Sequence, residues 1–340
     1  MFGGSIVWSV LALVAATAVL VIGGGPFTRL VDRLADRTGM GETLAGFILI
    51  GAVTALPGLI TSVLGAARGD PTFAMSNALG GIAVQTTFIA LADLFYRRAN
   101  LEHAAASLPN LLAPVGLSIM LAAVLVTGAG PQLTVFGVHP ASVLLVFLYW
   151  YWLRLSRHVG RNPMWRVEET RHTRHDEPDP DSHRPGETLA GMWAKFFALA
   201  AVVSVTGWVI GEAGLTLIEG TGMSGGFVGA VVTGFVTSTP ELVTVLYAVR
   251  IRALHLAIGD IIGGNGFDML FLSASDLAYR EGSIYAAMNQ EVILVTGLGI
   301  LLNLLVAAGL IRRQEQGIGF EGIAMFAVYG TGVAALAMIG

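Results

Sequence analysis

The chain has 340 residues, of which 54% are hydrophobic and only 12% are charged, and its mean hydropathy is +0.72. Soluble globular proteins have fewer hydrophobic and more charged residues than this chain, so the composition excludes that class of protein. The absence of cysteine also excludes disulfides, thiolate catalysis, Fe–S clusters and cysteine-based zinc sites. The chain therefore belongs in a lipid bilayer.

Predominantly apolar segments follow one another along the whole chain. A helix needs about 20 such residues to cross about 30 Å of hydrocarbon. We therefore expect an all-α, polytopic membrane protein of about ten transmembrane helices. The expected spans are residues 5–24, 43–66, 72–94, 108–127, 133–153, 189–210, 225–249, 254–274, 292–311 and 317–339.

Basic residues follow every second span, whereas the intervening loops hold little beyond Arg68 and Arg280. Short loops rich in Lys and Arg remain in the cytoplasm. The alternation therefore predicts a multi-pass protein of the cell membrane with both termini outside and the central linker cytoplasmic. The residues that set this orientation include Arg29, Arg33, Arg37, Arg97, Arg98, Arg157, Arg161, Arg166, Arg250, Arg252, Arg312 and Arg313.

One segment does not suit a bilayer: residues 156–187 are charged, contain proline and have few aliphatic side chains. We interpret this segment as a polar linker between five spans in residues 1–155 and five in residues 188–340. Its histidines and acids, among them His172 and Asp176, would also suit a regulatory metal site. Mixed-charge linkers more often serve as soluble connectors, and we favour that interpretation.

The two halves share an ungapped register when the chain is shifted by 183 positions. Because each half has an odd number of spans, the second copy enters the membrane from the opposite side, which is the inverted-repeat plan of many secondary transporters. We therefore expect two inverted five-helix repeats. The matched pairs include Gly51/Gly234, Thr54/Thr237, Pro57/Pro240, Gly80/Gly263, Gly81/Gly264, Phe88/Phe271 and Asp93/Asp276.

Pro57 and Pro240 lie within spans, where each frees the carbonyl group four residues before it. A bound cation would satisfy such carbonyls, although an ordinary proline kink is the alternative. In the next span of each half, the glycines at 80–81 and 263–264 weaken the helix. Close helix packing is a second interpretation of these glycines, and we expect both to hold.

Three acidic residues lie well inside predicted spans: Glu241, Asp260 and Asp268. No Lys or Arg lies at comparable depth, so cations or protons are their natural partners. Asp260 could also be a carboxylate at the end of a span, and Asp93 and Asp276 are expected at the membrane interface. The first-half counterparts of the three acids carry no charge: they are Gly58, Asn77 and Gln85.

The segments GFVTSTPELVT and AIGDIIGGNGFD resemble the calcium/cation antiporter superfamily, which includes the sodium/calcium exchangers. The resemblance implies that Glu241, Asp268, Thr237 and Ser238 coordinate a transported ion. In the first copy, GAVTALPGLIT and AMSNALGGIAVQ keep Thr54 and the proline. That copy has Gly58 where the family has Glu and Gln85 where it has Asn or Asp, and Gly81 and Gly264 replace the family's serine in the two copies.

These patterns predict a secondary active antiporter that exchanges calcium or another cation against sodium or protons by alternating access. We expect no resident cofactor, and as partners the lipid bilayer and inorganic cations but not nucleic acid. The alternative is a non-transporting or monovalent-cation- or proton-specific membrane sensor or scaffold with the exchanger fold. We do not expect an enzyme, because no Ser/His pair or His-x-x-x-His motif with a nearby acid lies within the spans. The candidate ion ligands are Glu241, Asp268, Thr237, Ser238, Thr54 and Gln85.

Overall fold

The computed structural model describes residues 5–38, 49, 51–96, 100–161, 187–251, 254–312 and 317–340, and this part of the chain is helical apart from its loops. The first half contains α1 Ile6–Thr38, α3 Gly51–Thr54, α4 Leu56–Ala67, α5 Pro71–Phe95, α6 Leu101–Ala104, α7 Leu108–Ala129 and α8 Pro140–Arg161. The second half contains α9 Leu189–Thr221, α10 Gly225–Phe227, the π-helical η2 Val228–Thr233, α11 Gly234–Thr237, α12 Thr239–Ile251, α13 Leu254–Ala278, the 3-10 helix η3 Ile284–Ala287, α14 Gln290–Ile311 and α15 Phe320–Ile339.

Seven helical segments of the described chain are long and apolar enough to cross a membrane: α1, α5, α7, α9, α10–α12, α14 and α15. The positions of α3–α4, α8 and α13 are those of the other three expected spans, and α3–α4 and α10–α12 each count as one interrupted segment. Three helices have bounds that differ clearly from expectation. α1 continues to Thr38 and α9 to Thr221, well beyond the predicted ends. The fifth span was expected to begin at residue 133, but α8 begins at Pro140. Phe136 and Gly137 adopt positive φ angles in a turn closed by a bridge between Val135 and Val138, which delays the helix.

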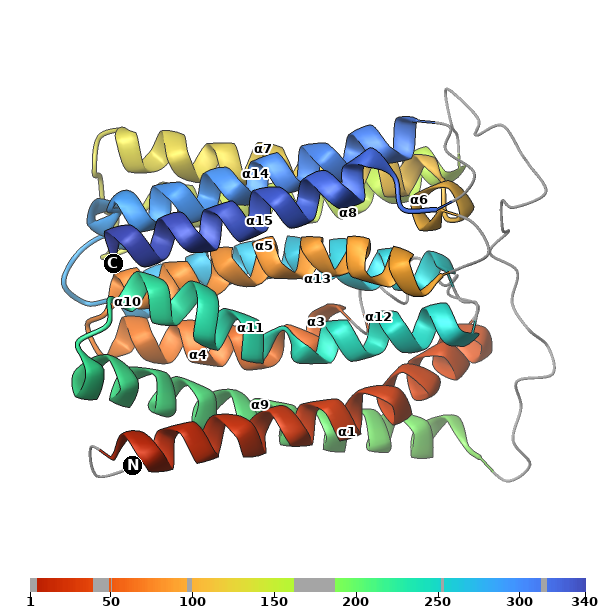
Figure 1. Ribbon diagram of the computed structural model, residues 1–340, viewed down its shortest axis with the longest axis horizontal. Helices are drawn as coiled ribbons and strands as arrows, with labels where there is room; N and C mark the ends of the chain where they lie inside the picture. Colours follow the sequence, from red (N-terminus) through yellow and green to blue (C-terminus); the bar gives the residue numbers. More distant parts are fainter. Residues whose placement is uncertain are drawn as a thin grey trace.

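The two halves run in opposite directions through the molecule (Figure 1). α1 runs from left to right in this view and α9 from right to left, and α5 and α13 are opposed in the same way. The N- and C-termini therefore lie at one end of the molecule. α8 ends at the other end, where α9 begins. The fold is the predicted all-helical polytopic membrane fold with two inverted repeats.

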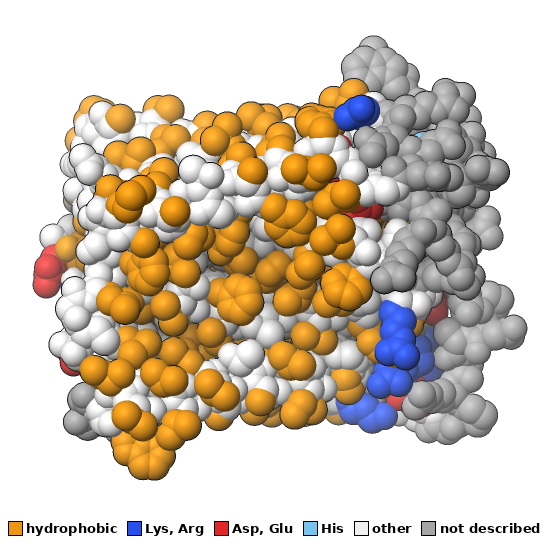
Figure 2. All heavy atoms as spheres, in the orientation of Figure 1, with side chains coloured by type: hydrophobic (Ala, Val, Ile, Leu, Met, Phe, Trp, Pro, Cys, Tyr) orange, Lys and Arg blue, Asp and Glu red, His pale blue; other side chains and the backbone are white. Residues whose placement is uncertain are grey.

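α5 and α13 lie at the centre of the molecule, with α1 and α9 along one side and α7, α8, α14 and α15 along the other (Figure 1). α5 is buried along most of its length, whereas α1 exposes large apolar side chains such as Val7, Trp8 and Ile22. Apolar side chains cover the middle of the face seen in Figure 2, and Lys and Arg gather at one end. An apolar belt next to a basic end is the surface expected of a protein in a bilayer.

The glycines in α5 and α13 are expected to weaken these helices and to allow close packing, and neither helix is interrupted at them. Both helices are continuous, and the glycines allow close packing. A methyl group added to Gly51 would lie 2.7 Å from the Gly264 nitrogen, and one added to Gly234 would lie 3.2 Å from the Gly81 nitrogen. The two contacts are equivalent in the repeats, so each broken segment meets the central helix of the other half through paired glycines.

Asp93 and Asp276 lie two residues before the ends of α5 and α13 and are buried within the protein. The Asp93 carboxylate accepts a hydrogen bond from the Leu101 nitrogen (2.6 Å), and Asp276 accepts one from the Ile284 nitrogen (3.0 Å). These partners are also 183 positions apart. Each carboxylate therefore fixes the chain that follows its helix, because an unpaired buried N–H would be costly.

Candidate functional site

The two proline-containing segments are interrupted in matched places. α3 ends at Thr54 and α4 begins at Leu56, while α11 ends at Thr237 and α12 begins at Thr239. Pro57 and Pro240 lie one residue inside the second helix of each pair, where a missing N–H is tolerated. The breaks at Ala55 and Ser238 lie next to the central helices α5 and α13. The sequence predicted both interruptions.

A small cavity lies between the two breaks and the central helices. Its volume is about 10 Å³, which is the space of a single water molecule or a small dehydrated cation. Side chains from both halves of the chain contribute to its wall. The lining residues are Ala55, Gly58, Asn77, Gly81, Gln85, Thr237, Glu241, Asp268 and Phe271.

Glu241 and Asp268 are the acidic residues of this cavity, and their exposed fractions are 0% and 1%. Neither oxygen of the Glu241 carboxylate has a hydrogen-bond partner among the described residues, and neither does Oδ1 of Asp268. Oε1 of Gln85 is also without a partner. Four side-chain oxygens from three residues are therefore buried without a donor, which is costly unless a cation or a proton satisfies them.

The Gln85 side-chain amide connects the two halves of the site. Its Nε2 donates hydrogen bonds to Oδ2 of Asp268 (2.9 Å) and to the hydroxyl of Ser238 (3.1 Å). These bonds leave Oδ1 of Asp268 and Oε1 of Gln85 as the oxygens without partners. The amide therefore orients the Asp268 carboxylate and makes it a ligand with one available oxygen.

The predicted threonines occupy equivalent places at the two breaks. The Thr54 hydroxyl donates to the Gly51 carbonyl (3.5 Å), and the Thr237 hydroxyl donates to the Gly234 carbonyl (3.3 Å). Thr54 lies next to the Glu241 carboxyl group, while Thr237 lines the cavity. All six residues singled out from the sequence thus lie in or directly beside one cavity.

Phe271 fills the place where the first half lacks an acid. A Cβ atom added to Gly58 would lie 2.7 Å from the Phe271 ring, so the cavity has no room for a longer side chain at position 58. The sequence pairs Phe271 with Phe88 but gives no sign that its ring enters the site. This contact depends on the packing of α4 against α13, which no local pattern reveals.

One polar residue of the cavity wall, Asn77, is satisfied within the protein. Asn77 donates to the Gly58 carbonyl (3.1 Å) and to the Ser62 hydroxyl (2.9 Å), and its own oxygen accepts from Thr233 (2.8 Å). This set of bonds gives Asn77 a structural role. Glu212 is buried in α9 and paired with Arg68 at 2.6 Å, and it was not among the expected intramembrane acids because the expected span ends at residue 210.

Two further candidates remain untested. Asp260 lies in α13, but its side chain is outside the described residues, as are His172, His175 and His183 of the linker. Within the described part of the chain, no group of three or more His, Asp and Glu residues could hold a metal ion. The cavity thus supplies two acidic side chains, and the amides of Gln85 and Asn77 and the hydroxyl of Thr237 add to its polar surface.

The inverted five-helix halves, broken opposite one another around buried carboxylates, define a class of membrane transport proteins. The sequence profile described as sodium/calcium exchanger protein matches residues 8–155 and 191–338. The chain therefore belongs to the sodium/calcium exchanger family, whose members are transporters and not enzymes. No curated protein sequence matches the chain.

Solved structures of the sodium-calcium exchanger NCX_Mj have a similar fold. A structure soaked with Na⁺ and without Ca²⁺ has a TM-score of 0.67 and 16% identity, covering 98% of this chain and 100% of that one. A structure soaked with Na⁺ and Ca²⁺ has a TM-score of 0.64 and 18% identity, with 98% and 99% coverage. One soaked with Na⁺ and Sr²⁺ has a TM-score of 0.65 and 17% identity, with 97% and 99% coverage.

Proposed function

We propose that the chain is a secondary active cation antiporter in which Glu241 and Asp268 carry the charge that binds the transported ion. Substrate and counter-ion occupy the cavity in turn, as the two inverted halves expose it to opposite sides of the membrane. The observation that carries this proposal is the set of four buried, unpartnered oxygens around one ion-sized cavity. Thr54, Thr237 and Ser238 complete the proposed site together with Gln85.

The charge of the site limits which ions it takes. Two carboxylates neutralise one divalent cation, or one monovalent cation together with one proton. Ca²⁺ prefers six to eight oxygen ligands, whereas the side chains offer four unpartnered oxygens here. Calcium binding would therefore draw on backbone carbonyls and water. Exchange of calcium or another cation against sodium or protons is the reaction that we propose, with a monovalent cation or proton as a strong competitor for the site.

The proposal also includes the orientation of the protein in the membrane and the bounds of its two repeat units. From the basic residues of alternate loops, we propose that both termini lie outside and that residues 156–187 lie in the cytoplasm. Residues 1–155 and 188–340 are proposed as the two repeat units. Alternating access then follows from the opposite orientation of the two units.

The test is ion flux in proteoliposomes that contain the purified protein. Gradients of Ca²⁺, Na⁺ and H⁺ are imposed one at a time, and uptake is measured for the wild type and for Glu241→Gln. The substitution keeps the size of the side chain and removes its charge, so flux should disappear. Flux that is unchanged in Glu241→Gln would reject the proposed site.

A second function, a cation sensor or scaffold without transport, has support from Gly58 and Phe271. The first half lacks an acid, and a ring occupies its place. Cation binding measured by calorimetry, together with the absence of flux under every imposed gradient, would favour this second function. Flux that depends on Glu241 would eliminate it.

A further inference from the structure

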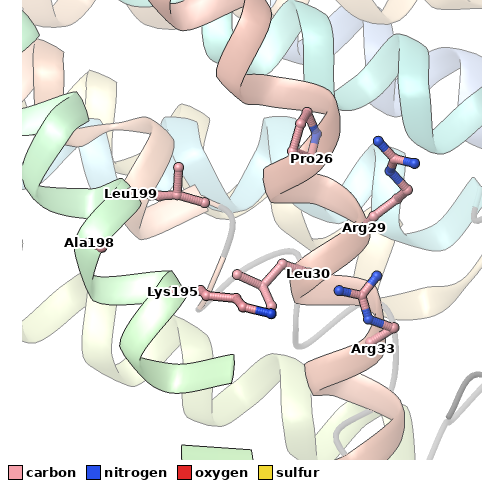
Figure 3. A pocket seen from close by; sticks show the side chains of 7 residues that line it. All are labelled: Pro26, Arg29, Leu30, Arg33, Lys195, Ala198 and Leu199. Carbon is pink, nitrogen blue, oxygen red and sulfur yellow. The ribbon is translucent and has the colours of Figure 1, made fainter. Parts of the chain in front are cut away.

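A second pocket lies between α1 and α9 (Figure 3) and shares no lining residue with the ion cavity. Its volume is about 450 Å³, large enough for part of a lipid molecule. None of its lining side chains is acidic, and basic and apolar side chains are brought together by two helices from different halves. The lining residues are Pro26, Arg29, Leu30, Arg33, Lys195, Ala198 and Leu199.

Two of the basic side chains already hold an oxyanion at the edge of this pocket. Nε of Arg33 lies 3.2 Å from Oε2 of Glu187, and Nζ of Lys195 lies 3.0 Å from Oε1 of the same carboxylate. Arg29 stacks over the Tyr247 ring, with its Cζ atom 5.4 Å from the ring centre. Three cations against one carboxylate leave this group of side chains with a net positive charge, which would attract another anion.

Figure 2 shows Lys and Arg side chains gathered at the end of the apolar face, and the pocket combines the same two kinds of side chain, three basic and four apolar. On the same two helices, Ile22 exposes 75% and Phe197 64% of its surface, as side chains that face lipid do. Pro26, Leu30 and Leu199 continue this apolar surface into the pocket. A free phosphate ion would use only the cations, whereas a phospholipid would use the cations with its headgroup and the apolar wall with its acyl chain.

We propose that this pocket binds the anionic headgroup of a phospholipid from the leaflet at the basic end of the molecule. The headgroup phosphate lies between Arg29, Arg33 and Lys195, and the upper part of one acyl chain lies against Pro26 and Leu199. Charge complementarity selects anionic over zwitterionic lipids, since each Lys or Arg near the membrane surface favours anionic lipid. The lipid competes with Glu187 for two of the three cations.

The experiment measures lipid binding to the purified full-length protein in detergent by native mass spectrometry. Phosphatidylglycerol, phosphatidylcholine and inorganic phosphate are added separately to the wild type and to the double variant Arg33→Gln/Lys195→Gln. The wild type should retain phosphatidylglycerol, and the double variant should bind it roughly thirty-fold more weakly. The charge-preserving variant Arg33→Lys/Lys195→Arg should retain most of the binding. Arg250→Gln, an exposed basic residue of α12 outside the pocket, is the matched control and should leave the binding unchanged.

Several results would overturn the proposal. Equal binding of phosphatidylglycerol to the wild type and the double variant would mean that the pocket is not the site. If the wild type binds phosphatidylcholine or inorganic phosphate as strongly as phosphatidylglycerol, an anionic lipid is rejected as the ligand. If the double variant does not fold, Glu187→Gln decides: it frees both cations and should strengthen phosphatidylglycerol binding, whereas unchanged or weaker binding would contradict the proposal.

Discussion

Gln85 and Asp268 are equivalent residues of the two repeats, and they hydrogen bond to each other across 2.9 Å. A direct bond between equivalent positions means that the pseudo-two-fold axis relating the repeats passes between these two side chains. One of them is an amide and the other an acid. The site is therefore symmetrical in backbone and asymmetrical in charge, and this asymmetry determines the effects of substitutions.

We expect Asp268→Asn to reduce ion binding without reducing stability. The new side chain keeps an oxygen for Gln85, and it removes a buried charge whose Oδ1 has no partner. Calcium and sodium binding, measured by calorimetry, should weaken at least about tenfold, while the melting temperature should stay the same or rise. A lower melting temperature with unchanged affinity would contradict the proposed role.

Asp276→Asn is the matched comparison, because this acid lies on the same helix but outside the cavity. Its carboxylate accepts hydrogen bonds from the nitrogens of Ile284 and His139 and from the Ser142 hydroxyl. An amide in its place points an N–H toward at least one of these donors. We expect a loss of about 1–3 kcal/mol of stability and an unchanged ion affinity, measured by thermal melting and calorimetry.

Restoring an acid at position 58 should require a change at Phe271. The ring lies where the new side chain would enter, so Gly58→Glu alone should lower the melting temperature. Gly58→Glu with Phe271→Ala provides space and a third carboxylate, and calcium affinity should rise at least about tenfold over the wild type. Phe271→Ala alone is the control. An equal gain from Gly58→Glu alone would show that the ring does not limit the site.

Gly80→Ala should destabilise the protein severely. The added methyl group would collide with Cα of Ala230, part of the backbone of η2, which cannot move as a side chain can. Overpacking of this kind costs about 1–3 kcal/mol or more. Gly297→Ala in α14 meets no atom within 4 Å and should leave the melting temperature nearly unchanged or raise it. Similar melting temperatures for the two variants would contradict this packing argument.

Glu102 should make stability depend on pH. This residue lies in the short helix α6, outside the spans, and burial followed by the negative charge of Asp93 raises its pKa from 4.5 to about 8. The folded state therefore binds a proton that the unfolded state releases above pH 4.5. The contribution of Glu102 to the free energy of unfolding is therefore present in full below about pH 4.5, and it is lost as the pH rises toward about 8.

Thermal melting of the purified protein between pH 5 and 9 checks this dependence. The Glu102→Gln variant remains neutral throughout, so its melting temperature should fall much less over the same range than that of the wild type. Parallel curves for the two proteins would show that Glu102 does not titrate as its burial requires.

The sequence by itself determined the membrane fold, the inverted repeats, the two proline breaks and the acids Glu241 and Asp268. These features depend on composition, on hydrophobic length and on residue types at a fixed offset, all of which can be read along one chain. It also indicated which half lacks an acid. It could not predict that Gly80 and Gly264 lie in continuous helices, or that Asp93 and Asp276 are buried acceptors of backbone hydrogen bonds.

Only the tertiary structure decided which distant side chains share the cavity. The Gln85–Asp268 bond joins residues 183 positions apart, and the Phe271 ring closes the space beside Gly58 because α13 packs against α4. The pocket of Arg33 and Lys195 likewise exists only because α1 and α9 lie side by side (Figure 1). Helix–helix packing fixes such contacts through the shapes of two surfaces at once, and neither surface is encoded in a local pattern.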